Sequence, residues 1–302
     1  MLYFLLSLLA LVVLLIGNAA LSIFLGILFA YFFKLPKTFI SKKVGTIPLQ
    51  IGIVILGATI SLPYALDVSS EYLPWISLFV IASFFAGLLI GKILGIHRRI
   101  AFLLSAGAAI CGGTAMAAIA PIIKAKPQEL LIAMTIIFLL NALAIILFPL
   151  AGHYLGMNNF EFGAWSALAI HDTSSVIGSA LIFSNESAQV AATLKLGRTI
   201  WLIPLILIAN WIFNREFTAA KFPRFIILFI FAIIINTMFN FNYEVQNFLQ
   251  TISQAFLIVG LFCIGTQFDS SELQSFSGKP LILALLLWVA VIPSAYYLVK
   301  YF

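Results

Sequence analysis

The sequence predicts an all-α, polytopic membrane protein with about ten or eleven transmembrane helices in two inverted-topology repeats that contain broken crossover helices. Of its 302 residues, 63% are hydrophobic and 9% are charged, whereas soluble domains carry about 25% charged residues. The apolar runs are about 15–28 residues long, which suits helices rather than barrel strands. A glycine-containing helix-breaking motif also occurs in both halves of the chain.

The predicted spans follow the apolar runs. The first run, 2–33, is interrupted at Gly17-Asn18, so it forms either one long broken crossing or two short ones. It has no cationic start and no clear cleavage site, so we expect a retained helix rather than a signal peptide. Further spans are predicted at 44–63, 74–95, 100–123, 127–151, 160–184, 195–213, 222–240, 247–272 and 280–301.

The distribution of basic residues predicts the orientation. The positive-inside rule places the loops 34–43, 92–99 and 214–224 in the cytoplasm, and the loops 64–73 and 241–246 outside. This pattern requires 160–184 to cross the membrane once, with an interruption near mid-membrane. Lys124 and Lys126 then fall outside, against the rule.

An internal repeat is indicated by a shift of about 152 residues, which places Cys111-Gly112-Gly113-Thr114 on Cys263-Ile264-Gly265-Thr266. Other weak matches occur near the same offset. The predicted repeats are residues 1–151 and 152–302, and they run in opposite directions across the membrane. Inverted repeats of this kind are typical of secondary transporters.

The two glycine motifs predict a central anion site. The adjacent glycines Gly112 and Gly113 should break a helix, and Thr114 can cap the next one. Half-helices that begin near Gly113 and Gly265 would point their positive ends at the centre of the protein. Alternatively, the glycines only allow close helix packing. The candidate substrate-binding residues are Cys111, Gly112, Gly113, Thr114, Gly265, Thr266, His171, Thr173 and Ser174.

Asp172 is the carboxylate that we expect deep inside the membrane, where such groups are costly and usually functional. It could carry a proton, ligate Na⁺, or pair with His171 or Arg198. The alternative is a polar plug that holds the bundle together. Lys195 and Arg198 fall at the start of a predicted span, where they could instead reach the outer interface. The candidates for coupling or gating are Asp172, Asn141, Lys195, Arg198 and Gln267.

Several function classes lack their sequence signatures. There is no Walker loop, dinucleotide fingerprint, zinc-protease motif or nucleophile elbow. The two cysteines have no metal-site spacing and form no disulfide framework. We therefore expect no enzyme activity, metal or cofactor, apart from a coupling Na⁺ or H⁺, and no nucleic-acid partner. The expected partners are a small anionic substrate and the lipid bilayer; the sequence leaves open a homo-oligomer.

The run from Ser105 to Ala115, followed by Pro121-Ile122-Ile123-Lys124-Ala125, resembles the YeiH-like sulfate exporter family of bacterial inner-membrane proteins. His171-Asp172, the stretch from Lys195 to Pro204 and that from Gly260 to Pro280 resemble it too. The resemblance implies a multi-pass transporter in the bacterial inner membrane that moves sulfur oxyanions, with an architecture related to bile-acid symporters and Na⁺/H⁺ antiporters. This chain departs from the family in having His171-Asp172 where His-Glu is common.

We expect a secondary active transporter of a small anion, such as sulfate or sulfite, that works by alternating access. The alternative is a Na⁺- or H⁺-coupled carboxylate symporter or a Na⁺/H⁺ antiporter, in which Asp172 would carry the ion. A non-transporting membrane receptor or scaffold is the third class.

Overall fold

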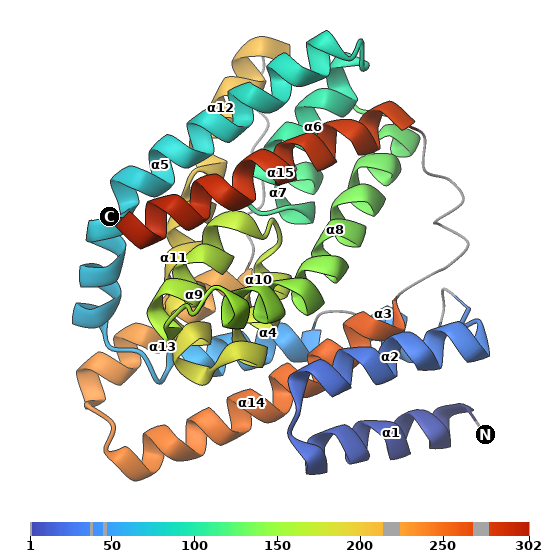
Figure 1. Ribbon diagram of the computed structural model, residues 1–302. Coiled ribbons are helices and arrows are strands. Elements are labelled where there is room, and N and C mark those ends of the chain that lie inside the picture. The colour runs from blue at the N-terminus through green and yellow to red at the C-terminus, as the bar shows by residue number, and fades with distance from the viewer. Residues whose placement is uncertain (1, 37–38, 45–46, 214–223, 268–277, 302) are drawn as a thin grey trace. The chain divides into compact units, whose positions relative to one another are not determined.

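The computed structural model describes residues 2–36, 39–44, 47–213, 224–267 and 278–301. This part of the chain is helical and contains no strand, which confirms the all-α class (Figure 1). Helices long and apolar enough to cross a membrane lie at Leu62–Ile93, Gln128–Tyr154, Asn185–Phe213, Tyr243–Thr266 and Gly278–Tyr301. The protein is therefore a polytopic membrane protein.

The contacts divide the chain into two compact units, each built from two segments. Unit 1 contains residues 1–66 and 224–274, and unit 2 contains residues 67–223 and 275–302. Each unit thus combines parts of both predicted repeats, and the division into repeats 1–151 and 152–302 stays a prediction.

Unit 1 begins with two helices rather than one long broken crossing. Gly17 ends the first helix with a φ of 67°, a conformation that favours glycine. Asn18 caps the second helix, because its side-chain oxygen accepts a hydrogen bond from the Leu21 amide. The helices of unit 1 are α1 (Leu2–Ile16), α2 (Ala19–Phe33), α3 (Ile40–Val44), α4 (Ile47–Gly57), α13 (Arg224–Phe239) and α14 (Tyr243–Thr266).

The prediction that a half-helix begins at Gly265 is wrong. Helix α14 continues through these residues and is capped at Gln267, so Gly265 lies in the last turn of a helix rather than at the start of one. A Cβ atom at Gly265 would lie 2.3 Å from the Ile23 carbonyl oxygen and 2.9 Å from the Cα of Gly26. Gly265 therefore allows α14 and α2 to pack closely, which was the alternative interpretation of the motif.

Unit 2 contains the helices that surround the candidate site. The predicted outer loop at 64–73 is helical and belongs to α5. The helices are α5 (Leu62–Ile93, whose first turn falls in unit 1), α6 (Arg98–Ala109), α7 (Gly113–Ile119), α8 (Pro127–Tyr154), α9 (Asn159–Ala169), α10 (Thr173–Phe183), α11 (Asn185–Ile200), α12 (Leu202–Phe213) and α15 (Gly278–Tyr301).

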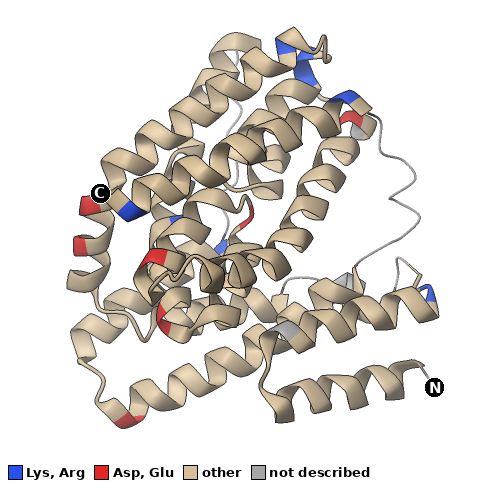
Figure 2. Cartoon of the chain, in the orientation of Figure 1, with Lys and Arg blue, Asp and Glu red and all other residues tan. Residues whose placement is uncertain are grey.

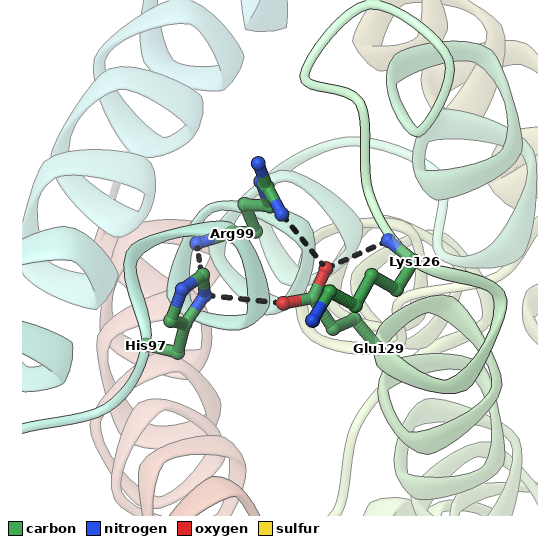
Figure 3. Close-up of polar contacts among 4 residues, drawn as sticks. All are labelled: His97, Arg99, Lys126 and Glu129. Atoms are coloured by element: carbon green, nitrogen blue, oxygen red, sulfur yellow. Dashed lines mark hydrogen bonds and ion pairs between the residues drawn. The ribbon is translucent and has the colours of Figure 1, made fainter.

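The predicted crossing at 100–123 is instead a helical hairpin, which we call hairpin 1 (residues 98–119). Across its tip, a Cβ atom at Gly107 in α6 would lie 3.2 Å from the Met116 side chain in α7. At its base, the Glu129 carboxylate in the first turn of α8 lies 3.2 Å from Nδ1 of His97 and 3.9 Å from Nη1 of Arg99 (Figure 3). The chain therefore enters and leaves at the same end of unit 2.

The predicted single crossing at 160–184 is also a helical hairpin, hairpin 2 (residues 159–183). The rings of Phe162 and Phe183 stack at its base with centroids 4.0 Å apart. The Asn159 side chain donates a hydrogen bond to Glu186 at the start of α11. Helix α8 lies between the two hairpins in the chain and runs from one end of unit 2 to the other. The hairpins therefore enter unit 2 from opposite ends (Figure 1).

Charged residues gather mainly at helix ends (Figure 2). The base of hairpin 1 forms the basic end of unit 2, which carries Lys92, His97, Arg98, Arg99, Lys124, Lys126 and Lys279. The base of hairpin 2 forms the acidic end, which carries Glu71, Glu161 and Glu186, with Lys300 paired to Glu161. Hairpin 1 returns Lys124 and Lys126 to the end that carries His97 and Arg99, so the prediction that they lie on the opposite side from the loop 92–99 is wrong.

We expect the two ends of unit 2 to lie on opposite sides of the membrane, because basic segments stay in the cytoplasm. Reagents added outside the cell should then reach only the acidic end. In a chain with Cys111→Ala and Cys263→Ala, a membrane-impermeant maleimide should label Glu186→Cys on intact cells. It should label Lys124→Cys only after the membrane is permeabilised. Labelling of both variants on intact cells would instead support a single crossing by residues 100–123.

Candidate functional site

The tips of the two hairpins meet inside unit 2. Gly112, at the tip of hairpin 1, has a φ of 58° and is the N-cap of α7. A Cβ atom at Gly112 would lie 3.3 Å from the Cβ of Asp172, at the tip of hairpin 2. The glycine thus permits both the turn and the close approach. The predicted breaks at Gly112 and at His171-Asp172 are confirmed, and these are the two breaks that face each other.

Asp172 caps the second half of hairpin 2. Its Oδ2 accepts hydrogen bonds from the backbone amide of Ser175 at 3.0 Å and from the Ser175 hydroxyl at 3.1 Å. A carboxylate is favourable at this position, because it satisfies free amides and faces the positive end of the helix. The first turn of α10 is therefore already occupied by an anion that belongs to the protein.

Lys195 and Arg198 lie on α11 and are fully buried. The expectation that they begin a span, close to the interface, is wrong, because α11 starts ten residues before Lys195. The Nζ of Lys195 donates to the Ile170 carbonyl at 2.7 Å and lies 3.4 Å from the Ala167 carbonyl. Lys195 thus binds the C-terminal end of α9.

Arg198 connects the two hairpins. Its Nε donates to the Ala109 carbonyl at 2.7 Å, and its Nη2 donates to the Ala108 carbonyl, both at the end of α6. Its Nη1 donates to the Ala167 carbonyl at 3.1 Å and to the Leu168 carbonyl, near the end of α9. The planar guanidinium suits several acceptors at once, and it satisfies carbonyls that an interrupted helix leaves open.

The charges at the tips are unbalanced. Lys195 lies within electrostatic range of both Arg198 and Asp172, so basic side chains outnumber carboxylates there by two to one. Within the described residues, neither Lys195 nor Arg198 has a carboxylate at ion-pair distance. A buried excess charge is costly unless a counter-ion offsets it. The arrangement favours an anion beside the tips.

The other predicted residues of unit 2 lie on or near the tips. Cys111, Thr173 and Ser174 are buried in or directly after the breaks. Thr114 does not cap α7, because the N-cap is Gly112. Phe138, one turn before Asn141 on α8, has the ring that a Cβ at Gly113 would meet at 2.9 Å. Asn141 is thus placed on the stretch of α8 beside the tips.

Buried polar atoms without a hydrogen-bond partner concentrate in unit 2. Such atoms are rare in native structures, and each calls for an explanation, such as local strain, a chemical role, or a bound water or ion. The sequence identified Asn141 and His171 among them. It did not identify Ser166, Ser179 and Trp288, because one serine or tryptophan in an apolar run carries no motif. The affected atoms in unit 2 are Asn141 Nδ2 and Oδ1, Ser166 Oγ, His171 Nδ1 and Nε2, Ser179 Oγ and Trp288 Nε1.

Gly265, Thr266 and Gln267 belong to unit 1. The Thr266 hydroxyl lies 2.7 Å from the Cys263 carbonyl and 2.8 Å from the Ser41 hydroxyl, so both of these partners belong to that unit. Their predicted role at a shared anion site is not tested, but the local geometry from which we inferred it is absent.

Two helical hairpins that enter from opposite ends and meet at buried cations define a polytopic membrane protein with a central polar site. A family model described as conserved hypothetical protein 698 matches residues 1–284. The chain belongs to this family, whose curated relatives include the UPF0324 membrane proteins.

Three relatives illustrate the likeness. The UPF0324 membrane protein of Bacteroides thetaiotaomicron is 38% identical over 272 residues, which are 89% of this chain and 82% of the relative. That of Vibrio parahaemolyticus is 37% identical over 91% of this chain and 90% of its own length. That of Bdellovibrio bacteriovorus is 35% identical, with coverage of 91% and 86%. No solved structure matches.

Proposed function

We propose that the chain is a secondary active transporter that moves a small anion across the bacterial inner membrane by alternating access. One observation carries the proposal: two hairpins enter unit 2 from opposite ends, and Arg198 holds both tips. Interrupted backbone at membrane depth is stable only where protein or a water-filled site satisfies it. In transporters such breaks form the substrate site.

The arrangement supports alternating access for a geometric reason. Hairpin 1 lies between the tips and the basic end of unit 2, and hairpin 2 lies between the tips and the acidic end. Displacement of one hairpin opens the site to one side of the membrane, while the other hairpin keeps the opposite side closed. The substrate need not change its binding residues during the cycle.

The positive formal charge at the tips supports an anion as the substrate. The resemblance of the run from Ser105 to Ala125 to sulfate exporters favours a sulfur oxyanion, such as sulfate or sulfite. The proposed site differs from the backbone-amide site that the sequence predicted. The Asp172 side chain already occupies the amides at the start of α10, and α7, with only seven residues, is too short to provide such a site. Side-chain donors around the tips supply the binding groups.

The second candidate is a Na⁺- or H⁺-coupled carboxylate symporter or a Na⁺/H⁺ antiporter. The observation that favours it is the half-buried carboxylate of Asp172, whose Cβ would lie 3.3 Å from a Cβ atom at Gly112 in the tip of hairpin 1. In that protein Asp172 would carry the ion, and Asp172→Asn would abolish coupling.

A flux assay tests the proposal with a matched pair of variants. Asn141 and Asn236 are both buried asparagines on apolar helices with unpartnered side-chain atoms, but Asn236 lies in unit 1. In proteoliposomes, wild-type protein should exchange labelled sulfate or sulfite. Asn141→Ala should reduce the rate of exchange about tenfold, because it removes one hydrogen bond to the substrate. Asn236→Ala should leave the rate of exchange unchanged.

The outcomes separate the candidates. Exchange that is independent of Na⁺ and survives Asp172→Asn supports the anion transporter. Flux of Na⁺ or a carboxylate, with none of sulfate or sulfite and complete loss in Asp172→Asn, would establish the second candidate. Absence of flux for every ion tested would leave the receptor or scaffold class.

A further inference from the structure

Two aromatic side chains beside the tip of hairpin 2 have buried nitrogen atoms without partners. His171 lies at the tip itself, and Trp288 lies in the middle of α15. The ring centroids are 6.5 Å apart, and the ring planes are tilted by 41°. The side chains are 1% and 8% exposed, and within the described structure Nδ1 and Nε2 of His171 and Nε1 of Trp288 form no hydrogen bond.

The chemistry of these nitrogen atoms restricts what they can bind. The indole N–H of tryptophan only donates, so its partner must carry an acceptor atom. Neutral histidine has one donating and one accepting nitrogen. The oxygen atoms of an oxyanion are acceptors. A hydrated cation turns the hydrogen atoms of its water outward and offers donors instead, so it does not suit Trp288.

A second tryptophan shows that the local packing does not require a free N–H. Phe148 stacks on Trp165 at 4.4 Å and on Trp288 at 6.1 Å between ring centroids. The Nε1 of Trp165 donates to the Ile292 carbonyl at 3.0 Å. Both indoles therefore belong to the same aromatic cluster, but only that of Trp165 has a protein acceptor.

The surrounding charges favour a negative partner. Arg198 and Lys195 both act electrostatically on His171. Their donors are largely directed at the ends of α6 and α9, so they attract an anion without enclosing it. Neutral donors that lie nearby can then hold the oxygen atoms.

We propose that the indole N–H of Trp288 and the imidazole of His171 bind oxygen atoms of the substrate oxyanion. This inference rests on the proposed function and adds a residue of α15 to the site. Trp288 is thus a specificity-determining residue: it favours oxyanions over cations, and over anions that lack a good hydrogen-bond acceptor.

The test compares Trp288→Phe with Trp165→Phe, because each change removes one indole N–H from the same cluster. Melting temperatures of the purified protein are measured with sulfate, sulfite, or chloride at matched ionic strength, and exchange is measured in proteoliposomes. Without oxyanion, Trp288→Phe should lose less stability than Trp165→Phe, because both lose ring volume but only Trp165 loses a hydrogen bond. Trp288→Phe should bind sulfate or sulfite about tenfold more weakly. Trp165→Phe should melt lower and keep its affinity.

Each result either supports or overturns the proposal. Equal stabilisation of wild type and Trp288→Phe would overturn it, as would a general salt effect that is the same in all three proteins. No stabilisation of wild type by either oxyanion would also overturn it. If an oxyanion stabilises wild type but not Trp288→Phe, and no flux is measured, the binding site is supported and the transporter function is refuted. If Trp288→Phe transports the oxyanion with an unchanged KM, the transporter function is supported and the role of Trp288 in binding is refuted.

Discussion

Arg198→Met is expected to lower the stability of the protein by at least about 3 kcal/mol and to abolish transport. The substitution leaves carbonyls at the ends of two half-helices without donors, namely those of Ala108, Ala109, Ala167 and Leu168. An unsatisfied buried group costs about 1–3 kcal/mol, and removal of one partner from a buried charged network costs about 3–5 kcal/mol. Thermal unfolding in detergent measures the change.

Arg198→Lys and Arg224→Met are the controls for this prediction. Lysine keeps the charge but lacks the planar fork, so it should recover only part of the stability. Arg224 is exposed at the start of α13 in unit 1, and Arg224→Met should melt like wild type. If Arg198→Met also melts like wild type, Arg198 does not hold the hairpin tips together.

Gly265→Ala is expected to destabilise unit 1 by about 1–3 kcal/mol, the usual cost of overpacking. The new Cβ would lie 2.3 Å from the Ile23 carbonyl oxygen, and backbone cannot move aside as a flexible side chain can. Helices α2 and α14 must therefore separate. Because Gly265 packs helices and lies outside the hairpin tips, the oxyanion-induced rise in melting temperature should persist in the folded fraction.

Two glycines provide the comparison for Gly265. A Cβ at Gly278 meets nothing within 4 Å, so Gly278→Ala should be neutral. A Cβ at Gly113 meets only the Phe138 ring, which is half exposed and can turn away, so Gly113→Ala should cost less than Gly265→Ala. If Gly265→Ala melts like wild type but is no longer stabilised by the oxyanion, Gly265 belongs to the binding site after all.

The sequence was sufficient to predict the class of fold and the positions of the breaks in unit 2. Apolar runs specify membrane helices, and Gly112-Gly113 and His171-Asp172 cannot continue a helix without cost. What the chain does after each break could not be predicted from the apolar pattern, because a crossing and a hairpin leave the same local pattern. Lys124 and Lys126 carried the relevant signal: their violation of the positive-inside rule indicated a hairpin.

The partners of each break were also beyond sequence reasoning. The match between Cys111–Thr114 and Cys263–Thr266 suggested that these motifs meet, yet glycine serves both helix breaks and close helix packing. Lys195 and Arg198 resembled interfacial anchors, because their acceptors are backbone carbonyls that no sequence pattern displays. Trp288 becomes a candidate binding residue only because it lies beside His171, which is 117 positions away in the chain.

The division of unit 2 into two chain segments bears on how the protein is made. Residues 224–274 of unit 1 are synthesised before α15, so the ribosome supplies the last helix of unit 2 after both segments of unit 1. Until α15 emerges, the Trp165 indole lacks the Ile292 carbonyl and Glu161 lacks Lys300. Transiently exposed apolar surface makes folding intermediates prone to aggregation. Arrival of α15 is the step that closes unit 2 and ends this exposure during biogenesis.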